Sequence, residues 1–341
     1  CSWGNELPWE WAPGMAQMWR TDFDVSLVRN RAFWSRIVSN FESNARHAVF
    51  SAPGGWNDPD MLEVGNPGLS AAEAQSTLAM WAISAAPLLL GNDLTHMDAA
   101  TRRLLLNPEV VAIDQDPLGA QATRICDRPA GREIWVKPLG SKTSGKFAVL
   151  LLNLSDKASQ ISVRWADLGI DNRPTVRDVF ARASVKATES GYATGLPAHG
   201  SRLLVVDGRF SWRHSVNYEA EWPGNEKRGD AALVTCGECS SGYAVSLGAE
   251  GKNTAGDLVF HRIDVPRPRK YRAFFYYVRN GLGNQTIRVR INRGAPQTVI
   301  LLMHMASWAA FPVDLQQGIN SIEIDSAGPH RVFLDNLKLL R

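Results

Sequence analysis

The sequence predicts a multidomain chain: part of a parallel β/α barrel, then an antiparallel β domain, then a second β-sandwich. Two observations predict this order. Residues 1–118 alternate short apolar stretches with helical ones, and polar loops follow the apolar stretches. Residues 120–208 and 216–341 instead contain short strand-like segments separated by Gly, Asp, Asn and Ser. Strand–loop–helix repetition is typical of parallel β/α folds, and regularly spaced short strands are typical of β-sandwiches.

The barrel part is organised around residues 51–62, which hold two prolines, two adjacent glycines, Trp56 and two carboxylates. Proline fixes φ and lacks an N–H donor, and glycine permits φ values that other residues avoid. We therefore expect a rigid loop rather than a helix or a regular strand. Such loops often carry binding and catalytic groups.

Around this loop, the pattern predicts a helix over 24–41, a short strand over 47–51 and a helix that begins after Ser70. Ser70 and Glu73 form a capping-box signature. A buried strand over 87–90 and a helix over 99–106 follow. About half of an eight-unit barrel is accounted for, and its active site should lie at the carboxyl ends of the strands.

The domain boundaries follow from changes in this pattern. We expect the barrel half over 1–119, an antiparallel β domain over 120–208, a connector over 209–215 and a second β-sandwich over 216–341. The predicted strands of the middle domain are 133–136, 146–154, 158–165, 175–178 and 202–206. Those of the last domain are 242–247, 256–263, 270–279, 285–291, 299–303, 321–324 and 332–339.

The composition bears on whether nucleic acid, a membrane or carbohydrate is the expected partner. The formal net charge is +3 over 341 residues and there is no Lys/Arg block, so nucleic acid is not an expected partner. No apolar run reaches the length of a membrane span, and no signal peptide is seen. The twelve Trp residues suit stacking on carbohydrate, although a buried core position is the commoner use of any one indole. The start at Cys1, without Met, indicates that the sequence begins inside a larger protein.

The four cysteines leave alternatives open. Cys236 and Cys239 form a lone C-x-x-C, which is weak evidence for zinc and fits a local disulfide or free thiols equally well. Cys1 and Cys126 have no evident partner in the sequence.

Four carboxylates of the barrel part are candidates for chemistry: Asp22, Asp24, Asp58 and Asp60. Glycoside hydrolysis needs two carboxyl groups across one bond. Arg20 stands four residues before Asp24, so in a helix both would share one face. The alternative is an ordinary surface ion pair. For Asp58 and Asp60, and for Asp93, the alternative is a turn carboxylate that binds backbone N–H groups.

Five ordered motifs resemble the α-galactosidase / α-N-acetylgalactosaminidase family, glycoside hydrolase family 27. They are Cys1–Gly4, Trp19-Arg20 with Asp24, Pro53–Leu62, Trp81–Leu94 and Ile113–Gly119. The resemblance covers 1–119, and 120–208 is similar to that family's C-terminal antiparallel domain.

The resemblance implies a retaining glycosidase that hydrolyses terminal α-linked galactose from oligo- or polysaccharides and needs no catalytic cofactor. It implies that Asp24 is the general acid/base and that Arg20 binds substrate beside it. It places Ser2 and Trp3 near the sugar's 2-position and Asp60 and Met61 at the pocket floor. The family's nucleophile lies in a Lys-x-Asp-x-Cys motif, which this sequence lacks. We therefore expect the chain alone to be inactive.

Substrate choice within the family stays open. A small residue at Ser2 leaves room for a 2-acetamido group, as in the N-acetylgalactosaminidases, but those enzymes also have a small residue where this chain has Asn5. A β-L-arabinopyranosidase of the same family is a further alternative. We place α-galactosidase first.

Residues 216–341 resemble carbohydrate-binding modules of the family 6/35 type, through Tyr218–Glu221, Gly242-Tyr243 and Phe333–Leu337. The resemblance implies a structural Ca²⁺ held by Glu219, Glu221 and Asp335, against the alternative of solvent-facing strand carboxylates. Trp308, in what reads as a loop, is the candidate for sugar stacking; a core position is the alternative. A non-catalytic carbohydrate-binding polypeptide is the non-enzyme hypothesis. Enzyme class and module together imply secretion. The sequence indicates no oligomeric state.

Overall fold

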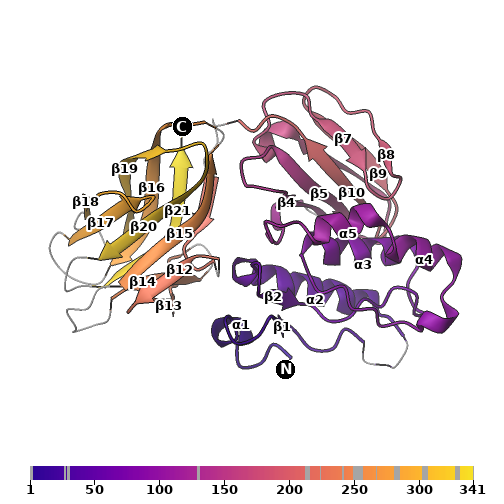
Figure 1. The fold of residues 1–341 in the computed structure, drawn as a ribbon. Helices are drawn as coiled ribbons and strands as arrows, with labels where there is room; N and C mark the ends of the chain where they lie inside the picture. The colour runs from indigo at the N-terminus through magenta and orange to yellow at the C-terminus, as the bar shows by residue number, and fades with distance from the viewer. Residues whose placement is uncertain are drawn as a thin grey trace. The chain divides into compact units, whose positions relative to one another are not determined.

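The computed structural model describes residues 3–26, 28, 31–128, 131–211, 216–222, 224–239, 242–248, 256–265, 267–279, 285–301, 306–326 and 331–340. The chain divides into two compact units, 1–211 and 212–341 (Figure 1). The ranges 1–119 and 120–208 lie within the first unit. No helix among the described residues is long and apolar enough to cross a membrane.

The first unit begins with helices around a short parallel sheet. Strands β1 and β2 pair in parallel, with Arg20 opposite Asp58, and a parallel bridge joins Leu62 to Leu90. The elements of this part are α1 (Pro8–Trp11), β1 (Met18–Arg20), α2 (Trp34–Arg46), η1 (Ala48–Phe50), β2 (Trp56–Asp58), α3 (Ala71–Ile83), η2 (Leu94–His96), α4 (Ala99–Leu105) and α5 (Pro108–Asp114).

Four of the expected elements differ in the structure. The predicted helix over 24–41 begins only at Trp34, because Val25 N–H donates to Asp60 and Asn40 donates to the Phe23 carbonyl, so tertiary contacts replace helical bonds. Residues 48–50 form a 3-10 turn with hydrogen bonds between residues three apart, not a strand. Residues 56–58, expected to be loop, form β2. Residues 87–90, expected to be a strand, contribute one bridge.

Helix α3 begins as the capping box predicts. The Ser70 hydroxyl accepts from Glu73 N–H, and the Glu73 carboxylate accepts from Ser70 N–H at 2.7 Å. The helix is buried along its second half, where Trp81 is fully enclosed. It packs against β5 and β10, so the helices and the following sheet share one hydrophobic core (Figure 1).

The rest of the first unit is antiparallel. A six-stranded sheet has the order β3-β4-β5-β10-β7-β8, and β6 pairs with β9. The five strands expected here are present, and β3, β8 and β9 were not expected. The bounds are β3 (Thr123–Arg128), β4 (Arg132–Pro138), β5 (Lys146–Asn153), β6 (Ser159–Arg164), η3 (Trp165–Leu168), β7 (Thr175–Asp178), β8 (Ala183–Ser184), β9 (Gly191–Leu196) and β10 (Ser201–Asp207).

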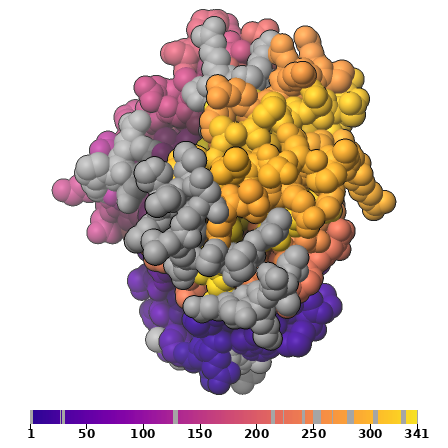
Figure 2. All heavy atoms as spheres, turned by 90° about the vertical axis from the view of Figure 1, so that its left-hand side faces the viewer, coloured from indigo at the N-terminus to yellow at the C-terminus, as the bar shows by residue number. Residues whose placement is uncertain are grey.

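The second unit is a β-sandwich of two antiparallel sheets (Figure 1), and the orange to yellow spheres of Figure 2 belong to it. One has the order β13-β14-β21-β16-β19, with β11 also on β21; the other has the order β12-β15-β20-β17-β18. The bounds are β11 (Val216–Glu219), β12 (Glu226–Gly229), β13 (Ala232–Thr235), β14 (Tyr243–Leu247), β15 (Gly256–Val265), β16 (Arg269–Arg279), β17 (Gln285–Ile291), β18 (Gln297–Leu301), β19 (Ala306–Leu315), β20 (Gly318–Ser326) and β21 (Val332–Leu340).

Candidate functional site

Arg20, the last residue of β1, brings two of the predicted carboxylates together. Its Nη1 lies 3.3 Å from Asp24 Oδ1, and its Nη2 lies 3.0 Å from Asp60 Oδ2. Nη2 also donates to the carbonyl of Asp22 at 3.0 Å. Because β1 and β2 run in parallel, the loops that follow them meet at the same edge, which is where β/α folds place their sites. Arg20, Asp24 and Asp60 therefore form one cluster.

Asp60 is the fixed member of this cluster. Its carboxylate accepts from Val25 N–H and from Met61 N–H, both at 2.8 Å, besides pairing with Arg20. Its carbonyl accepts from the Trp81 indole at 2.7 Å, and the residue is 7% exposed. The backbone adopts φ 90°, a strained value for a non-glycine residue, so these contacts hold it in place.

Asp24 is the accessible member. Its side chain is 56% exposed, and Oδ1 is held by Arg20. Among the described residues, no hydrogen bond reaches Oδ2. Its backbone carbonyl accepts from Arg36 at 3.0 Å, which anchors the main chain. Asp24 is thus a held carboxylate with one oxygen available to a ligand, as a proton-transfer group requires.

Of the other residues predicted to line the pocket, the structure describes Trp3 and Met61 but not Ser2. Trp3 is 51% exposed and Met61 is 41% exposed. Gly4 packs so closely on the carbonyl of Thr21 that a Cβ there would lie 2.7 Å from that oxygen, which sets the Trp3–Gly4 segment against the end of β1. Ser2 and Cys1 lie outside the described residues.

Buried polar side chains hold the 51–62 segment, among them Asp58, one of the four candidate carboxylates. Asn57 accepts from the Trp19 indole at 2.8 Å and donates to the His47 carbonyl and to Gln121 Oε1. Asp58 accepts from Asp60 N–H, and burial raises its pKa. The alternative of a turn carboxylate therefore describes Asp58 well. The partners of Asn57 lie 10 to 64 residues away in the sequence, so spacing did not predict which groups it binds.

A cavity of about 380 Å³ lies at the other ends of the two strands, between Met18, Trp56 and Pro87. Asp114 lines it and is 7% exposed. Burial raises the pKa of Asp114 to about 6 and lowers the pKa of the fully buried Lys137 nearby to about 8. This pair lies at the opposite ends of the strands from Asp24 and is no part of the cluster around Arg20.

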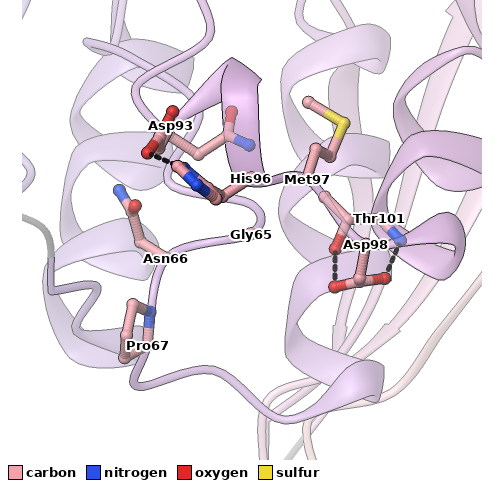
Figure 3. A pocket seen from close by; sticks show the side chains of 9 residues that line it. Gly65, Asn66, Pro67, Asp93, His96, Met97, Asp98 and Thr101 are labelled. Atoms are coloured by element: carbon pink, nitrogen blue, oxygen red, sulfur yellow. Dashed lines mark hydrogen bonds and ion pairs between the residues drawn. The ribbon is translucent and has the colours of Figure 1, made fainter.

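A second cavity, of about 180 Å³, lies beside the loop that contains Asp93 (Figure 3). Asp93 caps η2 and lies 2.9 Å from His96 Nδ1; hydrogen bonds from Thr95, and then from His96, lower its pKa to about 2. Asp98 caps α4 through Ala100 N–H and Thr101 N–H. Both carboxylates serve helix starts, so the capping interpretation of Asp93 holds.

In the second unit, Glu219, Glu221 and Asp335 each offer a carboxylate oxygen, and these atoms all lie within 4.8 Å of one another. The three residues meet because β11 pairs with β21 and Ala220 N–H donates to the Asp335 carbonyl at 2.7 Å. Clustered carboxylate oxygens suit a hard cation such as Ca²⁺. Glu221 and Asp335 are buried, which disfavours the alternative of solvent-facing carboxylates.

Trp308 was expected in a loop, and that prediction is wrong. It lies inside strand β19. Its segment alternates buried and exposed residues, and Trp308 points outward, 41% exposed. Lys338 Nζ lies 4.1 Å from the centroid of its ring, and Tyr276 packs at 5.3 Å. A core position is therefore excluded for Trp308.

The lone C-x-x-C is a disulfide. Cys236 and Cys239 are bonded to each other at the turn between β13 and β14. This pairing excludes the zinc and free-thiol alternatives for these two residues in this structure.

Two known protein-family models together match most of the first unit. Residues 12–116 match the family model described as alpha galactosidase A, and residues 130–206 match the alpha galactosidase C-terminal beta sandwich domain. The first unit is therefore related to the α-galactosidases of glycoside hydrolase family 27, as the motifs indicated.

Individual proteins similar to this chain are also named as α-galactosidases. An α-galactosidase of Oryza sativa is 36% identical over 208 residues, 60% of this chain and 48% of the relative. Among solved structures, α-galactosidase I of Mortierella vinacea is 28% identical with a TM-score of 0.53, over 62% of this chain and 58% of that one. The chain thus spans about half the length of the curated relatives it matches.

One solved structure is similar over a longer stretch. An isomalto-dextranase of Arthrobacter globiformis has a TM-score of 0.54 over 88% of this chain and 52% of its own. At 18% identity this likeness concerns the fold alone. It extends beyond residues 1–211, which make up less than two thirds of the 341 residues.

Asp60 is buried and Asp24 is exposed, so we expect that replacing each of them changes the free energy of unfolding by a different amount. Replacing Asp60 by Asn should lower the free energy of unfolding by about 2–4 kcal/mol, because the buried Arg20 charge loses its ionic partner and one of the two carboxylate oxygens that accept hydrogen bonds becomes an amide nitrogen. Replacing Asp24 by Asn should cost under about 1 kcal/mol, since that pair is exposed. Urea unfolding of both variants measures the difference. Equal costs would contradict the assignment of Asp60 as the fixed member.

Proposed function

We propose that the barrel part of this chain belongs to a retaining α-galactosidase, with Asp24 as general acid/base. The observation that supports this most is the Arg20–Asp24–Asp60 cluster at the ends of two parallel strands, inside a region related to α-galactosidases. The substrate would be terminal α-linked galactose on an oligo- or polysaccharide.

In this proposal Asp24 acts twice. It donates a proton to the glycosidic oxygen as the bond to the sugar breaks, and it then accepts a proton from the water that releases the sugar. Arg20 orients Asp24 through Oδ1, and Asp60 fixes Arg20. Asp60 and Met61 would form the pocket floor, with Ser2 and Trp3 near the sugar's 2-position.

The second carboxylate of a double displacement is not in this sequence. The family's nucleophile lies in a Lys-x-Asp-x-Cys motif, and the 341 residues contain none. Asp24 alone cannot form the covalent intermediate and also protonate the leaving group. The complete reaction would therefore need a polypeptide that supplies the nucleophile.

A second candidate is an α-N-acetylgalactosaminidase, which the small Ser2 favours because it leaves room for an acetamido group. Asn5 stands where that enzyme class has a small residue. Galactose therefore remains the first substrate. The β-L-arabinopyranosidase alternative has no observation in this chain that favours it.

We infer that residues 216–341 act as a carbohydrate-binding module that holds Ca²⁺ between Glu219, Glu221 and Asp335. The carboxylate cluster supports the cation site, and the outward Trp308 supports sugar contact. Bound Ca²⁺ would tie β11 to β21. A secreted protein that acts on polysaccharides would use such a module to stay near its substrate. A polypeptide that binds carbohydrate without catalysis remains the non-enzyme alternative.

The proposal predicts that the purified 341-residue chain releases no p-nitrophenol from p-nitrophenyl α-galactoside above the buffer rate. The reason is the missing nucleophile. A polypeptide that adds the four upstream β/α units of a family α-galactosidase serves as the positive control. Turnover by the 341 residues alone, lost on Asp24→Asn, would contradict the assigned need for a second carboxylate.

Metal addition tests the module. With Ca²⁺ at about 100 times its dissociation constant, the second unit should gain about 2.7 kcal/mol of stability, and EDTA should reverse the gain. Calorimetry in Ca²⁺ and in EDTA measures it. Glu219→Gln should remove most of the effect, and the exposed Glu238→Gln is the matched control. An identical unfolding transition with and without Ca²⁺ would contradict the cation site.

A further inference from the structure

Helix α2 turns polar side chains as well as apolar ones toward the protein interior. Arg36, Asn40, Ser43 and Asn44 follow one another at spacings of four, three and one residues, which places them along one face of a helix. The last three of these residues are buried, and a buried polar group is costly unless it is hydrogen-bonded. The four residues are called the polar stripe below.

The polar stripe binds the segment that carries Asp24. Each of its members donates a hydrogen bond to residues 21–24, which follow β1 and lie outside helices and strands. The bonds are Arg36 Nη2 to the Asp24 carbonyl, Asn40 Nδ2 to the Phe23 carbonyl, Ser43 Oγ to the Thr21 carbonyl and Asn44 Nδ2 to the Thr21 hydroxyl, at 3.0, 2.8, 3.0 and 3.3 Å. The helix therefore fixes the path of the chain up to Asp24.

Asn40 is the member of the stripe that reaches both loops of the site. Its Nδ2 donates to the carbonyl of Pro59 at 3.0 Å, besides that of Phe23. Phe23 directly precedes Asp24, and Pro59 directly precedes Asp60. One buried amide nitrogen thus ties together the backbone beside the two carboxylates that pair with the guanidinium of β1.

The other end of the same amide has no partner. Asn40 Oδ1 is buried and makes no hydrogen bond to the residues that the structure describes. An apolar side chain of similar shape would avoid burying an unpaired oxygen, so packing alone does not account for an asparagine at this position. The two bonds from its Nδ2 do account for it.

We propose that Asn40 is a positioning residue for the acid/base chemistry of Asp24, and that Arg36 assists it. The proposal rests on the function proposed above for Asp24. Arg20 holds one carboxylate oxygen of Asp24, but the side chain is 56% exposed, so its direction also depends on a fixed backbone. A misplacement of about 1 Å can lower the rate of an enzyme about 100-fold.

Hydrogen exchange of the 341-residue chain tests the positioning without any assay of activity. Asn40→Leu keeps the size of the side chain and removes both donated bonds. Exchange at the Val25 N–H, which is bonded to a carboxylate of the site, should become at least about 5-fold faster. Asn153→Leu is the matched control and should leave this exchange unchanged. Asn153 is equally buried, and its Nδ2 also donates to two carbonyls, those of Lys157 and Pro197.

The dependence of rate on the leaving group tests the chemistry, in a polypeptide that joins a complete upstream half-barrel to these 341 residues. Methyl α-galactoside needs a proton on its leaving group, whereas 2,4-dinitrophenyl α-galactoside does not. Asn40→Leu should lower kcat/KM about 10- to 100-fold for the methyl glycoside and less than about 3-fold for the dinitrophenyl glycoside. Asn153→Leu should lower both alike, if at all. Should Asn40→Leu not fold, Arg36→Met removes a half-buried donor and should show the same selectivity.

The outcomes separate this proposal from the one it rests on. Equal losses on both substrates in Asn40→Leu and Arg36→Met, beside a selective loss in Asp24→Asn, would overturn the positioning role and leave Asp24 as the acid/base. Absence of a selective loss in Asp24→Asn would overturn the acid/base role, and the positioning role with it. Unchanged exchange at Val25 in both stripe variants would overturn the hold of α2 on the segment.

Discussion

The site depends on one guanidinium at the end of a short strand. Arg20 reaches both Asp60, which is buried and held by backbone N–H groups, and Asp24, which is exposed. Its position follows from the parallel register of β1 and β2, and that register is supported by the buried amide of Asn57. Without this frame Asp24 would be an ordinary surface carboxylate. With it, Asp24 has one bound oxygen and one available oxygen.

The cluster divides structural and chemical roles between similar residues. The Gly-Gly-Trp-Asn-Asp-Pro-Asp segment is the most distinctive in the sequence, yet its carboxylates bind backbone N–H groups inside the protein. The plainer Asp24 keeps its carboxylate accessible. The most distinctive sequence motif therefore forms the framework of the site. The group proposed to react is distinguished by its solvent exposure.

Local signals were enough to predict some elements and not others. Ser70 and Glu73 predicted the start of α3 because a capping box is complete within four residues. The helix expected over 24–41 failed in its first part because Asp60, far along the chain, takes the N–H of Val25. Trp308 was misplaced because a ten-residue edge strand with small residues resembles a loop in sequence. The pairing of Arg20 with Asp60 also could not be predicted from spacing, since it needs the strand register.

The most direct test of the central claim compares Asp24 with Asp60 in a polypeptide that joins a complete upstream half-barrel to these 341 residues. Asp24→Asn and Asp60→Asn are assayed on an activated aryl α-galactoside with and without azide. If Asp24 is the acid/base, azide should restore turnover to Asp24→Asn, because it replaces the water that Asp24 would deprotonate, and should not restore it to Asp60→Asn. Rescue of the Asp60 variant and not of the Asp24 variant would contradict the account.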